Sequence, residues 1–86
     1  MRLSWYPEAW EDYLYWQIHD KNLLKKINEL LKDIARNGYK GIGKPEPLKE
    51  KLAGWWSRRV NDEHRLVYRL EDGICQILQC KGHYEG

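Results

Sequence analysis

The spacing of apolar residues changes partway along this chain of 86 residues, and that change limits the fold more than any other feature. Between residues 10 and 34 the apolar residues recur at intervals of three and four, which is typical of helices with one buried face. From residue 55 onward they alternate, as they do in strands. Glycines, Pro45 and Pro47 fill residues 38–54, which predicts an irregular, partly extended loop between a helical half and a strand half.

Two helices are predicted in the first half. The first runs from Pro7 to about His19, because proline is well tolerated in the first turn of a helix. Asp20 is placed to cap the second helix, which ends at Gly38. The apolar stripes comprise Trp10, Leu14 and Ile18 on the first helix and Leu23, Ile27, Leu30, Leu31 and Ile34 on the second. Two adjacent helices of this kind are expected to pack as a hairpin.

Four strands are predicted, one before the helices and three after the loop. They cover residues 2–5, 55–60, 64–70 and 74 to about 83. The order βααβββ defines an α+β fold in which a small, mostly antiparallel sheet packs against the helix hairpin. The length suits one domain over residues 1–86. Trp5, Trp10 and Trp16 are predicted to belong to its core.

The net charge of +2 hides an uneven distribution. Residues 1–20 carry one arginine and four acids, residues 21–69 carry thirteen lysines and arginines and six acids, and residues 70–86 carry one lysine and three acids. The basic middle segment predicts an anionic partner, although the lysines of residues 21–36 are also consistent with a solvated helix face. We find neither an apolar run long enough for a membrane span nor a secretory signal, so a cytoplasmic location is expected.

Cys75 and Cys80 are predicted to be reduced and semi-buried. They lie five residues apart in one expected strand, so they should point to opposite faces and cannot pair with each other. A Cys/His metal site is the alternative, but no C-x-x-C or H-x-x-x-H spacing accompanies them. The sequence therefore predicts neither a disulfide nor a metal, and no cofactor.

Two arginines are predicted to face each other across the sheet. With three-residue loops at 61–63 and 71–73, Arg59 lies opposite Arg65, and Arg65 lies opposite Gln79, with Lys81 and His83 on the same face. Opposed like charges are unfavourable unless an anion lies between them, and guanidinium groups bind phosphate in a bidentate manner. The pair is therefore interpreted as a phosphate site. The alternative is that these arginines form surface salt bridges with Asp62, Glu63 or Glu71.

An acid and a base accompany this predicted phosphate site. His83 lies on the same expected face as Arg65, and Glu46 lies in the glycine/proline loop between Lys44 and Lys49. Cleavage of an RNA backbone requires one group to remove the proton of a ribose 2′-OH and another to protonate the leaving 5′ oxygen, while cations stabilise the charge on phosphorus. The residue types present can supply all of these functions without a metal or a nucleophilic side chain.

Several segments resemble the YoeB (Txe/YoeB) toxins, which belong to the RelE-like superfamily of bacterial toxin–antitoxin systems. The matching segments are WxxYLYW (10–16), KKINELLKD (25–33), GKPEPLK (43–49), GWWSRR (54–59), EHRLVY (63–68) and the terminal HY (83–84). The resemblance runs from residue 2 to residue 84. One departure is that Glu85 and Gly86 follow the motif that usually closes the chain.

The resemblance implies a ribosome-dependent mRNA endonuclease that cuts the codon in the A site. Glu46 would be the general base, His83 the general acid, and Arg65 would stabilise the scissile phosphate. The substrate-binding residues implied by the family are Lys49, Arg59, Glu63 and Tyr84, the last as a stacking or positioning residue. The reaction would need no metal and would leave a 2′,3′-cyclic phosphate and a 5′-OH.

The implied partners are the 70S ribosome and mRNA, and a YefM/Phd-like antitoxin whose C-terminal segment covers the site. Exposed aromatic residues such as Trp55 and Trp56 would suit such coupled folding and binding. A homodimer, operator binding only through the antitoxin complex, and no membrane partner are also expected. Two alternatives share the basic face, namely an RNA- or ribosome-binding module without catalysis and a co-repressor acting with its antitoxin.

Overall fold

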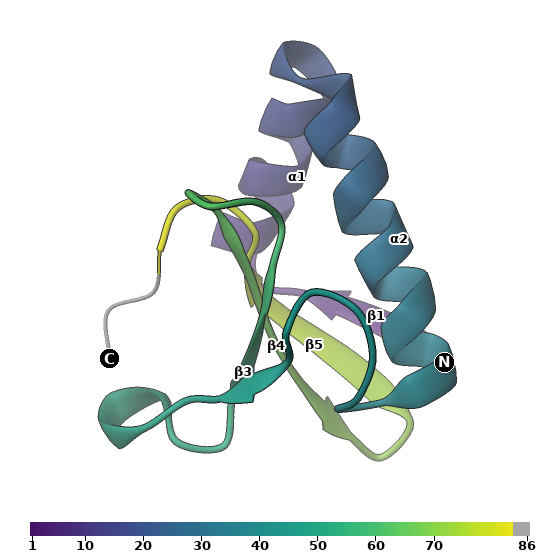
Figure 1. Cartoon of the computed structure of the whole chain (residues 1–86), viewed down its shortest axis with the longest axis vertical. Coiled ribbons are helices and arrows are strands. Elements are labelled where there is room, and N and C mark those ends of the chain that lie inside the picture. The colour runs from purple at the N-terminus through teal and green to yellow at the C-terminus, as the bar shows by residue number, and fades with distance from the viewer. Residues whose placement is uncertain (84–86) are drawn as a thin grey trace.

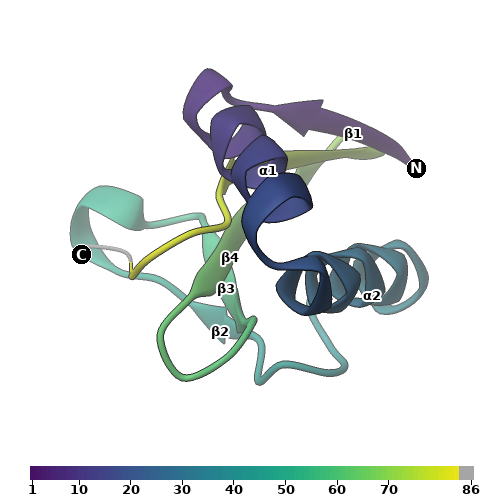
Figure 2. The same ribbon diagram turned by 90° about the horizontal axis from the view of Figure 1, so that it is seen from above.

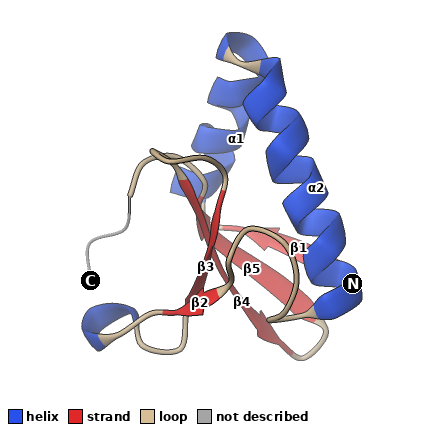
Figure 3. Cartoon of the chain, viewed as in Figure 1, coloured by secondary structure: helices blue, strands red, loops and turns tan. Residues whose placement is uncertain are grey.

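The computed structural model describes residues 1–83 and shows an α+β fold with two helices and a five-stranded mixed sheet (Figures 1 and 3). The elements in chain order are β1 (Arg2–Trp5), α1 (Pro7–His19), α2 (Lys21–Asn37), β2 (Glu46–Pro47), the short 3-10 helix η1 (Glu50–Leu52), β3 (Trp56–Arg59), β4 (Arg65–Glu71) and β5 (Ile74–Gln79). The predicted order βααβββ is confirmed, with β2 as an addition inside the glycine/proline loop.

The strands lie in the order β1-β5-β4-β3-β2. β1 pairs in parallel with β5, and all other neighbours are antiparallel. The first and last strands of the sequence therefore lie side by side, with β1 at the edge of the sheet and Leu3 opposite Cys75.

The two helices cover one face of the sheet (Figure 2). The Asp20 side chain accepts hydrogen bonds from the backbone N–H groups of Asn22 and Leu23 at 3.1 Å, so it caps α2 as predicted. α2 ends where Gly38 adopts a positive φ of 64°, a conformation that glycine adopts without steric cost. Beneath the helices lies the main core, built from residues such as Ala9, Trp16, Ile27, Leu30, Ile34, Leu66, Tyr68 and Ile77.

The turn between β3 and β4 has the predicted register. Val60 donates its N–H to the carbonyl of His64 at 3.0 Å, and Arg59 lies opposite Arg65. The turn between β4 and β5 is shorter than predicted, because Glu71 pairs with Ile74. Asp72 and Gly73 both have positive φ values, 51° and 75°, as the two central residues of a type I′ hairpin turn do.

A bulge in β5 shifts the register a second time. Tyr68 lies opposite Ile77 but Val67 lies opposite Gln79, so Leu78 is the extra residue. The prediction that Arg65 lies opposite Gln79 was therefore wrong. β5 also ends at Gln79, so His83 follows the sheet instead of belonging to it.

The same bulge explains the position of the two cysteines. Cys75 and Cys80 are free and fully buried in the main core, not on opposite faces as predicted, because the extra residue reverses the alternation between them. Burial raises the pKa of the Cys75 thiol to about 11 and that of Cys80 to about 12, so both are protonated at neutral pH.

The aromatic residues follow the predictions only in part. Trp16 is buried in the main core and Trp5 packs against it, whereas Trp10 is 43% exposed. Trp55 is buried and Trp56 is half-buried, so the expectation that both are exposed was wrong. Within residues 1–83 no helix has the length and apolar character needed to cross a membrane.

Candidate functional site

The sheet face opposite the helices, which we call the open face, holds most of the predicted site residues. Strand alternation places Ser57 and Arg59 of β3 on it, together with Arg65 and Val67 of β4. Glu46 of β2 lies opposite Ser57 and so faces the same side. Glu46 and Arg59 are diagonal neighbours, an arrangement that places residues roughly 7–8 Å apart. The open face thus carries the Glu46 carboxylate beside the guanidinium groups of Arg59 and Arg65.

Arg59 and Arg65 differ in their partners. The Arg65 guanidinium donates to the backbone carbonyls of Asn61 at 2.7 Å and His64 at 3.1 Å. Among residues 1–83 no carboxylate lies within ion-pair distance of Arg65. The guanidinium of Arg59 lies 3.9 Å from the carboxylate of Asp62, whose side chain is fully exposed. An exposed pair at this distance is weak, so the salt-bridge alternative accounts for little of the charge.

Glu46 and Lys49 lie on an arm, residues 46–55, that folds back on the open face. Leu48 donates its N–H to the Trp55 carbonyl at 2.9 Å, and both side chains pack with Val67 in a second, small core. The guanidinium of Arg69 lies over the Trp55 ring at 4.5 Å. This small core anchors the arm, while Glu46 and Lys49 remain exposed.

The end of the described chain approaches Arg65 through its backbone. Arg65 donates its N–H to the carbonyl of Gly82 at 3.0 Å, and the exposed His83 follows directly. Glu63 lies in the adjacent turn, where its exposed carboxylate is 3.7 Å from His64 Nε2. Tyr84 lies outside the described residues. The fold therefore brings Glu46, Arg59 and Arg65 to one face with His83 beside it, whereas Lys49 and Glu63 lie at the margins.

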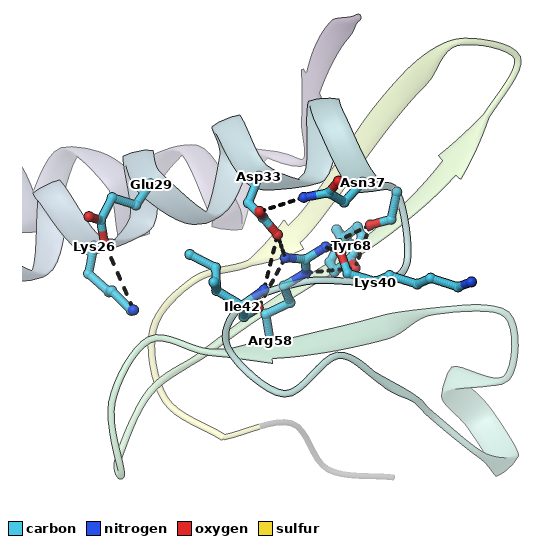
Figure 4. Close-up of polar contacts among 9 residues, drawn as sticks. Lys26, Glu29, Asp33, Asn37, Lys40, Ile42, Arg58 and Tyr68 are labelled. Atoms are coloured by element: carbon cyan, nitrogen blue, oxygen red, sulfur yellow. Dashed lines mark hydrogen bonds and ion pairs between the residues drawn. The ribbon is translucent and has the colours of Figure 1, made fainter.

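Sequence reasoning missed a buried arginine behind the open face. Arg58 alternates with Arg59, points toward the helices and is 0% exposed. Its guanidinium pairs with Asp33, as Figure 4 shows. It also donates to the carbonyls of Ile42 at 3.0 Å, Gly38 at 2.7 Å and Lys40 at 2.8 Å.

The Arg58 network also reaches the main core, since the Nε–H donates to the Tyr68 hydroxyl at 3.1 Å. Arg58 therefore ties α2 and the loop that leads to Glu46 to the centre of the sheet. The alternation of Trp56, Ser57, Arg58 and Arg59 could have revealed it, because it assigns adjacent arginines to opposite faces.

Because of the Arg58 network, the protein should lose stability at acidic pH. The hydrogen bond from Arg58, more than those from Asn37 and the Ile42 N–H, holds the pKa of Asp33 below its usual value of 3.8. A carboxylate whose pKa is lowered by folding stabilises the protein above its unfolded pKa, and the contribution is lost as pH falls through the folded value.

We expect Asp33→Asn to flatten the acid limb of the stability profile. Urea unfolding from neutral pH to about pH 2 would show a steep loss of unfolding free energy below pH 3.8 in the wild type. The variant should be less stable at neutral pH and lose less on acidification. Asp62→Asn is the matched control, because it removes the same charge from a fully exposed side chain. Parallel profiles for the wild type and Asp33→Asn would contradict the expectation.

A five-stranded mixed sheet with two helices on one face is the fold of RelE-like toxins. YafQ from E. coli shares this fold with a TM-score of 0.73 at 21% identity, over 96% of this chain and 94% of that one. The YoeB/ParE toxin from Agrobacterium tumefaciens matches with a TM-score of 0.93 at 45% identity, over 98% of this chain and all of the other.

The family model for the YoeB-like toxin of bacterial type II toxin-antitoxin systems matches residues 5–84. Toxin YoeB of Escherichia coli K12 is 56% identical over 84 residues, which cover 98% of this chain and 100% of that protein. The YoeB of Staphylococcus aureus, solved as a dimer, matches with a TM-score of 0.92 at 55% identity, over 98% of each chain. The chain belongs to the YoeB toxin family.

Proposed function

We propose that this toxin is a ribosome-dependent mRNA endonuclease and that residues 1–86 act as one toxin domain. The observation that supports the proposal best is the Arg59–Arg65 pair on the open face, with Glu46 on the same face. Opposed guanidinium groups need an anion between them, and a phosphodiester supplies one in the geometry that arginine binds. The carboxylate beside the pair can accept the proton of the attacking hydroxyl.

In the proposed reaction Glu46 removes the proton of the ribose 2′-OH, and the 2′ oxygen attacks the adjacent phosphorus. Arg65 and Arg59 stabilise the charge that develops on the phosphoryl oxygens. His83 protonates the leaving 5′ oxygen, so the products carry a 2′,3′-cyclic phosphate and a 5′-OH. Lys49 and Glu63, at the margins of the site, and Tyr84, beyond the described residues, are proposed to hold the RNA.

The proposed partners are the ribosome, mRNA and an antitoxin of the YefM kind. A YoeB–YefM complex from Staphylococcus aureus, whose toxin is 54% identical to this chain, supports the antitoxin. The YoeB dimer from the same species supports self-association as a further proposal. Binding to the ribosome would rest on lysines and arginines meeting ribosomal RNA, and it should weaken as salt rises.

The deciding experiment compares the wild type with the Glu46→Ala/His83→Ala variant on programmed ribosomes and on naked mRNA. Primer extension should map cuts to the A-site codon, only with ribosomes and only with the wild type. Product ends should be cyclic phosphate and 5′-OH, and 5′-phosphate ends would exclude the mechanism. Ribosome binding by the wild type without cleavage would favour a non-catalytic binding module.

Arg65→Lys should slow cleavage by roughly 100-fold, because lysine keeps the charge but lacks the planar fork that contacts two phosphoryl oxygens. Single-turnover cleavage at saturating ribosome concentration measures the effect. Arg36→Lys on the exposed side of α2 is the matched control and should cleave at the wild-type rate. Full activity of Arg65→Lys would mean that the site requires only a positive charge.

A further inference from the structure

The segment that follows β5 is held at two residues before it reaches His83. The N–H of Cys80 donates to the Asp12 carboxylate at 3.0 Å, and the Cys80 carbonyl accepts from Trp16 Nε1 at 2.9 Å. The N–H of Gly82 donates to His64 Nδ1 at 2.8 Å, and the Gly82 carbonyl accepts from the Arg65 N–H at 3.0 Å. Both peptide groups that flank Gly82 are therefore fixed by consecutive residues at the start of β4.

The hydrogen bond to Gly82 defines the state of the His64 ring. A backbone N–H can only donate, so Nδ1 must be unprotonated and the neutral ring carries its proton on Nε2. Nε2 lies 3.7 Å from the Glu63 carboxylate, which favours a proton at that position. The side chain is 12% exposed, and its ring packs edge-on against Trp16 at a centroid distance of 4.7 Å. Packing and charge thus hold an acceptor toward Gly82.

We propose that His64 is a positioning residue that acts on the reaction through the Gly82 backbone, by fixing where His83 stands relative to Arg65. The inference rests on the proposed function, in which His83 is the general acid. His64 and Arg65 hold the peptide groups immediately before His83. The position of the proposed acid is therefore fixed relative to Arg65, the proposed phosphate-binding residue. Gly82 has a φ of 78°, so the chain turns sharply at the fixed point.

Two substitutions separate the acceptor from the packing. His64→Phe keeps a ring against Trp16 but removes the acceptor, whereas His64→Asn places an amide oxygen close to the position of Nδ1. A small misplacement of a reacting group can cost about 100-fold in rate. We therefore expect His64→Phe to slow single-turnover cleavage by about 100-fold at saturating ribosomes, with the half-saturating ribosome concentration unchanged. His64→Asn should recover at least about tenfold of that loss.

A double-mutant cycle tests whether His64 acts through His83. If it does, His64→Phe should slow the wild type but not the His83→Ala variant, since a residue that positions an absent acid has nothing left to contribute. Additive losses in the double variant would overturn the proposal. So would equal losses in His64→Phe and His64→Asn, because the acceptor would then be irrelevant.

The hydrogen bond between Gly82 and His64, which we call the Gly82 clamp, can be tested without any substrate. In the free protein, the Gly82 amide should be protected from hydrogen exchange in the wild type and in His64→Asn but not in His64→Phe, while the Leu66 amide stays protected in all three. If His64→Phe does not fold, His64→Gln replaces it, because its amide reaches the Nε2 position instead. Unchanged protection of Gly82 overturns the proposal. If Gly82 shows the expected pattern of protection but the wild type does not cleave mRNA, the proposed function is refuted and the Gly82 clamp still stands.

Discussion

Arg58→Met should lower the free energy of unfolding by about 3–5 kcal/mol, because it removes one partner of a buried ion pair. This is the largest loss of stability that we expect from the substitutions proposed for this protein. Methionine fills most of the space that the arginine side chain occupies beneath α2. It cannot donate to the carbonyls of Gly38, Lys40 and Ile42, which accept hydrogen bonds from Arg58. A buried carbonyl without a donor costs about 1–3 kcal/mol. Urea unfolding at neutral pH, followed by fluorescence of the tryptophans, measures the change.

Arg59→Met is the matched control for that experiment. It removes the same charge from the next residue of β3, where the side chain is 47% exposed and its ion pair with Asp62 spans 3.9 Å. Substitutions at such positions usually change stability by about 0.5 kcal/mol or less. Similar losses from both substitutions would show that net charge, and not the buried network, determines the stability of this region.

His83→Ala should slow cleavage by roughly 10²- to 10⁴-fold, the usual contribution of one general acid or base. The effect should appear in the single-turnover rate at saturating ribosomes and not in ribosome binding, because the proposed role of His83 is to protonate the leaving oxygen. The fold should survive, since the segment is anchored through Cys80 and Gly82.

His19→Ala provides the control for that prediction. His19 is the exposed last residue of α1, away from the open face, and its removal should leave the cleavage rate unchanged. If His83→Ala cleaves at the wild-type rate, this histidine is not part of the mechanism. Another group or water then protonates the leaving oxygen.

Local signals predicted most of the fold. Apolar spacing predicted both helices, and Asp20 and Gly38 marked their boundaries. The predicted stripe on α1 was not its buried face, because Trp10 is 43% exposed and Ile18 79% exposed. The short turn at 61–63 gave the register that opposes Arg59 and Arg65. These features depend on neighbours within a few residues. A sequence read alone can therefore recover them.

The features that sequence reasoning missed depend on tertiary contacts. The bulge at Leu78 reverses the alternation and so places Cys80 in the main core. β5 also ends at Gln79, before His83. Trp55 is buried because Leu48 and Val67 meet it from distant segments. Arg58 is buried because α2 supplies Asp33. No periodicity within one element encodes partners of this kind.

For the candidate site, the opposition of Arg59 and Arg65 could be predicted, but the tertiary contacts around them could not. His64 was predicted on the apolar face of a strand, and its ring does pack against Trp16, although β4 begins one residue later. Its bond to Gly82 requires the chain to turn back after β5. The arm that carries Glu46 likewise depends on a small core whose members are far apart in sequence.

The parallel pairing of β1 with β5 has a consequence for the synthesis of this protein. Residues 2–5 leave the ribosome about 70 residues before their partner strand, residues 74–79, is translated. Until β5 emerges, β1 has no neighbour and both helices lack much of the surface that they cover. Contacts between distant segments form late, so the nascent chain can complete its sheet only after residues 74–79 have left the exit tunnel.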